Sequence, residues 1–221
     1  MTGSWDPVWE TIFSTREWGK YPPEELIRFT ARSFYRAPDR RQIRLLDAGC
    51  GPGACCWYLA REGFSVTGFD GSPTALQKGR ERLEADHLTA EWVKGDLLQL
   101  PFPEASFDGA IDIAAIQQNR AASIQKILAG MARVLKPGGR FFSMMLASGS
   151  WGDGTGTCLE PRTYTGIPDG PYQGEGITHF AVEEELRSWL APFRELNLEL
   201  STRTYENRSH EVRHWIITAT R

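Results

Sequence analysis

The chain lacks an excess of basic charge and lacks a long apolar run. Its 25 Lys and Arg are outnumbered by 28 Asp and Glu, which gives a formal net charge of −3 and a pI near 5.9. Proteins that bind nucleic acid usually carry a basic surface, so this balance argues against a nucleic-acid partner. The apolar runs fall short of the roughly 20 residues of a membrane span, and the first residues contain no signal-peptide core. We therefore expect a cytoplasmic protein without a membrane partner.

Cysteine is also scarce, and its spacing does not suit metal binding. The four cysteines form no C-x-x-C pair and have no nearby histidine: Cys50, Cys55, Cys56 and Cys158. Three of them crowd a glycine-rich segment, where small apolar side chains pack. We expect reduced thiols, and neither a disulfide scaffold nor a metal site.

What the chain does contain is an alternation of strand-like and helix-like segments. With 221 residues and 41% hydrophobic content, it suits a single domain spanning residues 1–221. The alternation predicts an α/β protein with a doubly wound parallel sheet. Ser72 and Pro73 are expected to begin a helix that reaches about Asp86. Residues 196–205 and 212–220 alternate as two closing strands joined by a turn at 206–208.

The most informative segment is residues 43–53, I-R-L-L-D-A-G-C-G-P-G. An apolar run typical of a buried strand is followed by Asp47 and by glycines at 49, 51 and 53. A helical pattern begins at Ala54. Glycines let the backbone approach a ligand closely, and a helix N-terminus favours an anionic group. This order of strand, glycine turn and helix predicts a nucleotide-type cofactor site. Because Ala54 fits the third position of G-x-G-x-x-G/A, the glycine spacing alone also permits NAD.

Four motifs in order resemble the class I S-adenosylmethionine-dependent methyltransferases. D-A-G-C-G-P-G at 47–53 resembles the family's first motif. E-W-V-K-G-D-L-L with L-P-F at 91–102 resembles its third-strand motif, and F-D-G-A-I-D at 107–112 its fourth. R-V-L-K-P-G-G-R at 133–140 resembles the turn before its fifth strand. The resemblance covers residues 43–147. It implies a Rossmann-like, mostly parallel seven-stranded sheet with a C-terminal antiparallel hairpin, and S-adenosylmethionine as cofactor.

The resemblance also implies a role for each matching residue. The backbone at Gly49, Gly51 and Gly53 would hold the methionine portion, and Asp47 would orient its ammonium group. Asp70, about 20 residues beyond the glycines, would bond the ribose hydroxyls. Asp96 would accept from the adenine amino group while Leu97 donates its N–H. Asp112 would face the ammonium through its main chain.

Two further segments are expected to cap this site. Residues 1–36 form a predicted N-terminal helical cap, in which Trp18 and Tyr21 are expected to contact the cofactor through cation–π attraction. Residues 147–178 form a predicted glycine-rich lid or substrate loop without regular structure. Where many relatives carry a histidine pair, this chain has Gln117 and Gln118. Gln117 is expected to orient the acceptor, and His179 is the candidate base, with a loop-anchoring role as its alternative. His210 and His214 are expected to lie far from the cofactor.

The sequence therefore predicts S-adenosylmethionine-dependent methyl transfer to an oxygen or nitrogen of a small molecule. One alternative is a tRNA or protein methyltransferase that uses the arginine run Arg36, Arg40, Arg41 and Arg44. Another alternative is a non-catalytic subunit that binds the cofactor. It stays possible because Gln117 and Gln118 replace the histidine pair of many relatives. The acceptor and the oligomeric state stay undetermined.

Overall fold

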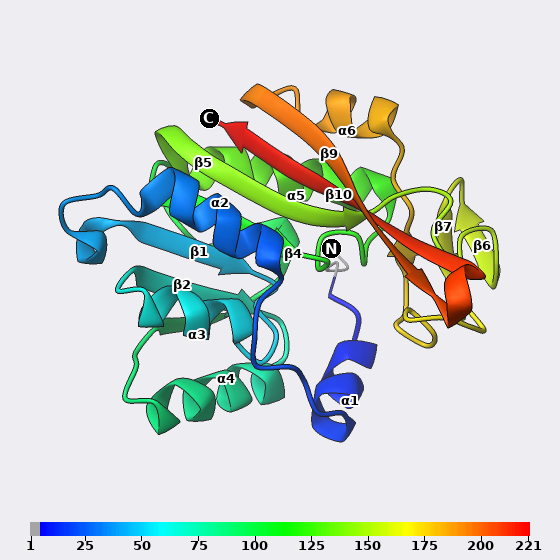
Figure 1. Ribbon diagram of the computed structural model, residues 1–221, viewed down its shortest axis with the longest axis horizontal. Coiled ribbons are helices and arrows are strands. Elements are labelled where there is room, and N and C mark those ends of the chain that lie inside the picture. The colour runs from blue at the N-terminus through cyan, green and yellow to red at the C-terminus, as the bar shows by residue number, and fades with distance from the viewer. Residues whose placement is uncertain (1–4) are drawn as a thin grey trace.

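Within residues 5–221, the part of the chain described by this computed structural model, a seven-stranded sheet forms the centre (Figure 1). The strand order is β3-β2-β1-β4-β5-β10-β9. Strands β1 to β5 pair in parallel, and β10 lies antiparallel between β5 and β9. The strands are β1 (Arg44–Ala48), β2 (Ser65–Asp70), β3 (Glu91–Lys94), β4 (Phe107–Ile113), β5 (Leu135–Leu146), β9 (Arg194–Tyr205) and β10 (His210–Thr220). The predicted mostly parallel sheet with its closing hairpin is confirmed.

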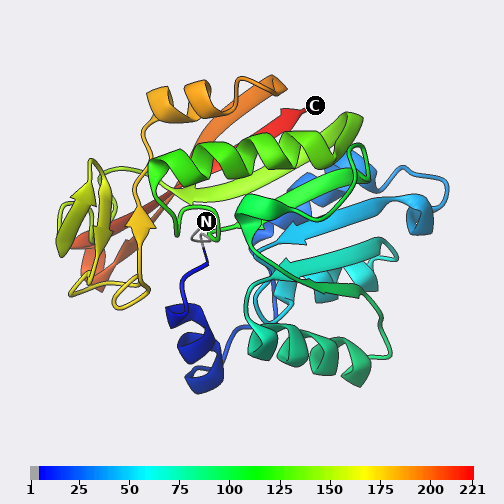
Figure 2. The ribbon, with the colours of Figure 1, turned by 180° about the vertical axis from the view of Figure 1, so that it is seen from behind.

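Helices cover both faces of this sheet, and each face has its own apolar core (Figures 1 and 2). Side chains of successive strand residues point to opposite faces. Leu45 accordingly packs with one group of helices and Leu46 with the other. The first group is α2 (Glu24–Phe34), α3 (Ala54–Arg61) and α4 (Pro73–Ala85); the second is α5 (Ala121–Val134) and α6 (Glu183–Trp189).

Several helix ends follow the predicted local signals. Ser72 caps α4 by accepting from the backbone N–H of Ala75, as expected for a serine at that position. Pro23 precedes α2, whose first turn contains Glu24 and Glu25. Three short 3-10 turns complete the connections: η1 (Arg40–Gln42), η2 (Leu97–Gln99) and η3 (Glu206–Arg208). None of the helices in the described chain is long and apolar enough to cross a membrane.

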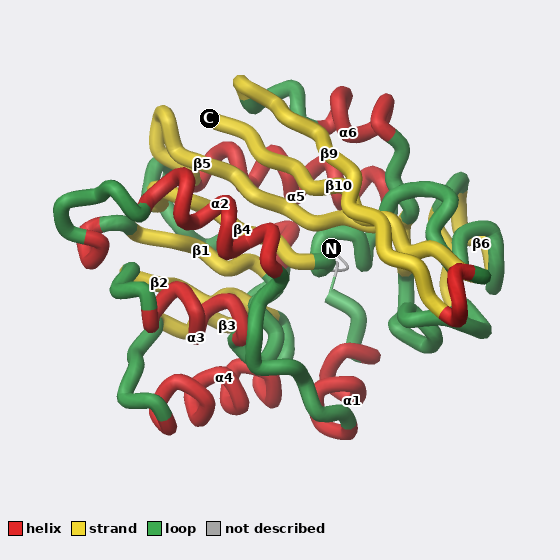
Figure 3. Tube along the Cα trace, viewed as in Figure 1, coloured by secondary structure: helices red, strands yellow, loops and turns green. Residues whose placement is uncertain are grey.

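The predicted lid contains more regular structure than its glycine content suggested. A small antiparallel sheet has the order β6-β7-β8, formed by β6 (Thr157–Glu160), β7 (Thr163–Thr165) and β8 (Thr178–His179). Figure 3 shows it beside the far end of the β9–β10 hairpin. Strands of two to four residues are too short to produce a recognisable alternating pattern, so they could not be predicted from the sequence.

The N-terminal region divides into two parts. Helix α1 (Val8–Thr15) stands away from the sheet and contacts α4, as Figure 1 shows, whereas α2 packs directly against the sheet. Only the first part, with the link that follows it, therefore lies near the carboxyl ends of β1 and β2. The predicted cap at 1–36 begins with residues 1–4, which lie outside the described residues.

Candidate cofactor and acceptor site

A cavity of about 400 Å³ lies at the carboxyl ends of β1, β2, β3 and β4. Ligands of open α/β sheets bind at this edge, where the strand order reverses. Three parts of the chain meet in its wall: the strand ends, the segment before α2, and the lid. The strand ends contribute Asp47, Gly49, Gly51, Asp70 and Leu97; the N-terminal segment contributes Trp5, Trp9, Phe13, Trp18 and Tyr21; the lid contributes Tyr172 and Glu175.

The glycine loop after β1 is held by main-chain bonds and by close packing. Gly49 has a φ of +73°, and its N–H donates to the carbonyl of Phe69. A Cβ at Gly49 would lie 2.2 Å from the Cβ of Ala115. Both the conformation and the space therefore require glycine. The loop presents an open backbone to the cavity, as a cofactor cradle must.

Asp70 ties the end of β2 to this loop. One carboxylate oxygen accepts from the Gly51 N–H at 2.9 Å and the other from the Ser72 N–H at 2.8 Å. The side chain is 8% exposed and lines the cavity. A carboxylate offers about four lone-pair sites, so these two bonds leave room for a diol. The arrangement fits the ribose role that the sequence implied.

Asp47 lies at the end of β1 and is buried beneath the loop. Its carboxylate accepts from the Cys56 thiol at 3.2 Å. Burial, together with the neighbouring Asp70 and Asp112, raises the pKa of Asp47 to about 7. A cationic ammonium group beside it would favour the ionised form. Asp47 lines the cavity, so its geometry and charge both suit that role.

The third strand end contributes Leu97 to the cavity, and Trp5 lies beside it. The backbone N–H of Trp5 donates to an Asp96 carboxylate oxygen at 3.1 Å. The indole lies so close to Gly71 that a Cβ there would be 2.0 Å from its Cδ1. Trp18 and Tyr21 both line the cavity, as predicted for cofactor contacts. Trp18 packs edge-on against Phe13.

Two residues of the predicted cofactor set serve the scaffold in this structure. Gly53 caps α3 with a φ of +73°, and a Cβ there would meet Trp92 and Gly79 on the α4 side. Asp112 is fully buried, accepts from the Ala115 and Ile116 N–H groups and from the Ser143 hydroxyl, and is absent from the cavity lining. Both residues shape the loops that do line the cavity.

The two glutamines after β4 have different positions. Gln117, the predicted acceptor-orienting residue, is fully buried, and its Oε1 accepts from the Leu146 N–H at 2.6 Å. It fixes the end of β5 and does not line the cavity. Gln118 does line it. The Oε1 of Gln118 accepts from the Thr178 hydroxyl at 3.1 Å, while its Nε2 has no hydrogen-bond partner among residues 5–221.

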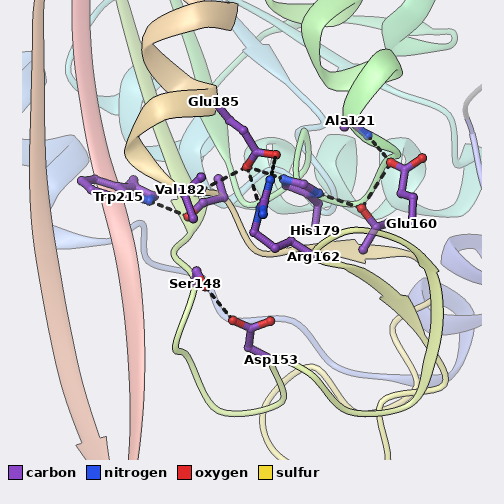
Figure 4. A network of polar contacts seen from close by, with 11 residues as sticks. Ala121, Ser148, Asp153, Glu160, Arg162, His179, Val182, Glu185 and Trp215 are labelled. Atoms are coloured by element: carbon purple, nitrogen blue, oxygen red, sulfur yellow. Dashed lines mark hydrogen bonds and ion pairs between the residues drawn. The ribbon is translucent and has the colours of Figure 1, made fainter.

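His179 lies in a buried polar cluster outside the cavity lining (Figure 4). Its Nε2 is 3.2 Å from Glu185 and its Nδ1 is 2.7 Å from the Thr163 hydroxyl. A carboxylate cannot donate, so Nε2–H donates to Glu185 and Nδ1 accepts from Thr163. Arg162 also binds Glu185. Burial lowers the pKa of His179. This arrangement matches the loop-anchoring alternative, and the predicted base role has no support in it.

The lid supplies site residues that the sequence did not single out. Glu175 lines the cavity with a side chain that is 12% exposed, and burial raises its pKa to about 7. Tyr172 also lines the cavity, and its hydroxyl lies 2.8 Å from Nε2 of His214. His214 was expected far from the cofactor edge, but it pairs with Leu146 at the carboxyl end of β5, so the closing strand brings it to the edge of the sheet where the cavity lies. No sequence motif marks these residues; only the folded loop brings them to the cavity.

Comparisons with known proteins agree with this geometry. A family model described as a methyltransferase domain matches residues 45–139. An uncharacterized methyltransferase from Synechocystis is 41% identical over 98 residues, 44% of each chain. A demethylmenaquinone methyltransferase from Tropheryma whipplei is 42% identical over 97 residues, 43% of this chain and 38% of that one. The chain thus spans less than half the length of either relative.

The structure of the chain is also similar to that of a solved methyltransferase. A crystal structure of an S-adenosylmethionine-dependent methyltransferase from Methanosarcina mazei matches with a TM-score of 0.68 and 24% identity, covering 85% of this chain and 94% of that one. At that identity the likeness shows the fold. S-adenosylmethionine is the cofactor that such domains use, and the cradle formed by Asp47, Gly49 and Asp70 fits it. The chain thus contains a methyltransferase domain at residues 45–139, and its fold is that of an S-adenosylmethionine-dependent methyltransferase.

Proposed function

We propose that the protein transfers a methyl group from S-adenosylmethionine to an oxygen or nitrogen of a small molecule. The observation that carries this proposal is a single cavity that joins the cofactor cradle to a wall of aromatic and polar side chains. When bound, S-adenosylmethionine supplies an activated methyl group. The residues of the chain need to hold the acceptor in line and exclude water.

The cavity wall supports a small acceptor. Trp9, Phe13 and Trp18 form a run of ring contacts along α1 and the link after it. Across the cavity, Gln118 and Tyr172 offer polar groups. Apolar walls with a few placed polar groups are typical of small-molecule sites. The relative named as a demethylmenaquinone methyltransferase acts on such a molecule.

The arginine run gives little support to the tRNA or protein alternative. Arg40 bonds Glu62, and Arg41 bonds Asp39, so these two charges are paired within the chain. Arg44 begins β1, at the end of the strand opposite the cavity. A polynucleotide bound there would lie far from the cofactor cradle. Salt-dependent binding of tRNA by the purified protein would favour this alternative.

The N-terminal segment and the lid are proposed to act together as a cap. Arg16, just after α1, lies 3.9 Å from Glu175 of the lid. Next to it, a Cβ on Gly176 would lie 2.8 Å from the Asp6 carboxylate. Hydrogen exchange with and without S-adenosylhomocysteine tests this idea. Slower exchange at 5–21 and 147–178 in the complex supports a closing cap, and equal exchange in both states contradicts it.

Calorimetry with the purified protein tests the proposed function directly. We expect S-adenosylmethionine and S-adenosylhomocysteine to bind at micromolar concentration, and NAD not to bind. Incubation with methyl-labelled S-adenosylmethionine and a small-molecule extract should then move label into a small product. Cofactor binding without any transfer to small molecules, tRNA or protein would support the non-catalytic alternative instead.

A further inference from the structure

Glu175 has surroundings that are unusual for a carboxylate. It lies on the lid, and its side chain is only 12% exposed. Its nearest ion-pair partner within residues 5–221 is Arg16, whose guanidinium lies 3.9 Å away and is itself half exposed. None of the hydrogen bonds found among the described residues reaches the carboxylate oxygens of Glu175. A buried carboxylate in this situation gains stability from a donor that enters the cavity.

The other charged groups that line the cavity define what that donor can be. Asp6 packs beside Gly176, and Asp47 and Asp70 lie on the cofactor side of the same cavity. These carboxylates disfavour an anionic acceptor. The aromatic rings of Trp9 and Phe13 suit a flat molecule. Tyr172 is held by His214 and can fix the orientation of that molecule.

We propose that Glu175 accepts the proton of the methyl acceptor, and that this acceptor is a flat, uncharged compound bearing an O–H or N–H group. This inference rests on the proposed function. In the step assigned to Glu175, the O–H or N–H bond breaks and the proton passes to a carboxylate oxygen. The electron pair of that bond stays on the acceptor atom, which becomes the nucleophile. Burial that raises the pKa of Glu175 to about 7 gives it the proton affinity that a base needs near neutral pH.

Three probes of similar size test the inference by calorimetry on protein saturated with S-adenosylhomocysteine. Phenol and aniline carry the proposed group, and benzoate carries a negative charge. At pH 8 we expect both uncharged probes to bind at least about tenfold more tightly than benzoate. Glu175→Gln should remove most of this preference. Phenol binding by the wild type should strengthen as the pH rises through about 7, and the variant should show no such change.

Arg16→Gln is the control for a merely structural role. If Glu175 only ties α1 to the lid, this substitution should abolish the preference as Glu175→Gln does; the inference predicts that the preference persists. Equal affinity for benzoate and phenol, failure of all three probes to bind, or an unchanged preference in Glu175→Gln would overturn it. Failure of S-adenosylhomocysteine itself to bind would instead refute the proposed function.

A second, independent observation concerns Trp5. Its indole lies against Gly71, directly after Asp70, and its backbone N–H donates to Asp96. The sequence resemblance assigns Asp96 to the adenine amino group, with Leu97 donating its N–H to the adenine ring. A flat bicyclic ring and an N–H donor of the chain itself therefore lie where those of the cofactor are expected.

The geometry points to Trp5 as an internal occupant of the adenine subsite, which the cofactor displaces when it binds. When an internal group occupies a binding site, the apparent affinity of the ligand equals its intrinsic affinity multiplied by the fraction of molecules in which the site is free. Trp5→Ala should therefore bind both S-adenosylhomocysteine and adenosine several-fold more tightly than the wild type, while Trp5→Phe, which keeps a flat ring, should stay close to it. Calorimetry measures both. Equal or weaker binding by Trp5→Ala would overturn this inference and place Trp5 within the cofactor site as a supporting wall.

Discussion

The two halves of the cavity are formed by different kinds of groups, main chain in one and side chains in the other. The cofactor half consists largely of main chain at the ends of β1 and β2, together with the buried carboxylates Asp47 and Asp70. The other half, which we propose binds the acceptor and call the acceptor half, consists of side chains from α1 and from the lid, such as Trp9 and Glu175. A half built from backbone has little freedom to change, because the glycine loop continues directly from β1 and its Gly49 and Gly51 N–H groups are bonded to the end of β2. The side-chain half is where one fold can be adapted to a different acceptor.

The strongest test of this comparison is steric. Gly49→Ala would place a Cβ 2.2 Å from that of Ala115 at a φ of +73°. We expect S-adenosylhomocysteine affinity to fall about a hundredfold, roughly 3 kcal/mol, because strain and overpacking both displace the loop. Gly138→Ala is the matched control, with a φ of +78° and no described atom within 4 Å. If both variants bind equally well, the backbone cradle is less rigid than the comparison requires.

Removal of a carboxylate should have a somewhat smaller effect. Asp70→Ala deletes the acceptors of the Gly51 and Ser72 N–H groups as well as the expected ribose partner. We expect calorimetry to show S-adenosylhomocysteine binding weakened by roughly 1–3 kcal/mol. Asp39→Ala removes a similar backbone acceptor, that of Arg41, in η1 at the opposite end of β1. That control should bind normally, and an equal loss there would mean that the effect is one of global stability.

The pH dependence of binding tests the charge of the cofactor half. Burial raises the pKa of Asp47 to about 7, so it is largely protonated at pH 6 and ionised at pH 8. An ammonium group favours the ionised carboxylate, so affinity should rise with pH. We expect up to about tenfold tighter S-adenosylhomocysteine binding at pH 8 than at pH 6. Asp47→Asn cannot ionise and should show a flat profile. A steep profile in that variant would assign the titration to another group.

The same contrast explains what the sequence could predict. Residues 44–61 form one continuous strand, turn and helix, so the positions of Asp47, Gly49 and Gly51 follow from local pattern. Their placement in the cavity agrees with the implied roles. Asp70 is brought to them by parallel pairing of β1 and β2, which an α/β pattern already requires. The cofactor half is thus encoded locally.

No local sequence pattern of this kind predicts the residues of the acceptor half. Glu175 and Tyr172 lie in a loop with little periodicity, and His214 reaches Tyr172 because the antiparallel pairing of β10 with β5 places it opposite Leu146. The sequence offered His179 as its candidate base, with a loop-anchoring role as the alternative, and its buried surroundings match the second role. Its neighbours Thr163 and Glu185 lie 16 and 6 residues away in β7 and α6, and residue order does not show that both side chains turn toward the imidazole.

The smallest effect on the cavity is expected from His179→Asn. A general base would be worth roughly 10²–10⁴-fold in turnover, so turnover by the folded variant separates the two roles once an acceptor is known. We expect a far smaller change, with S-adenosylhomocysteine affinity preserved. The loss should appear in the free energy of unfolding, by roughly 1–3 kcal/mol, because the hydrogen bonds of Thr163 and Glu185 lose their partner. Thr163→Val, which removes one of these bonds, should cause a smaller loss of the same kind.

The free energy of unfolding at acidic pH provides a second test of the His179→Asn variant. Burial lowers the pKa of His179 below its ordinary value of 6.5, so the unfolded chain takes up a proton first as the pH falls. The free energy of unfolding should therefore decrease below about pH 6.5, and less steeply in His179→Asn. Denaturant unfolding at pH 5.5 and 7.5 measures the difference. A large loss of turnover with unchanged stability would restore His179 as the base and would move part of the acceptor chemistry into the buried cluster behind the lid.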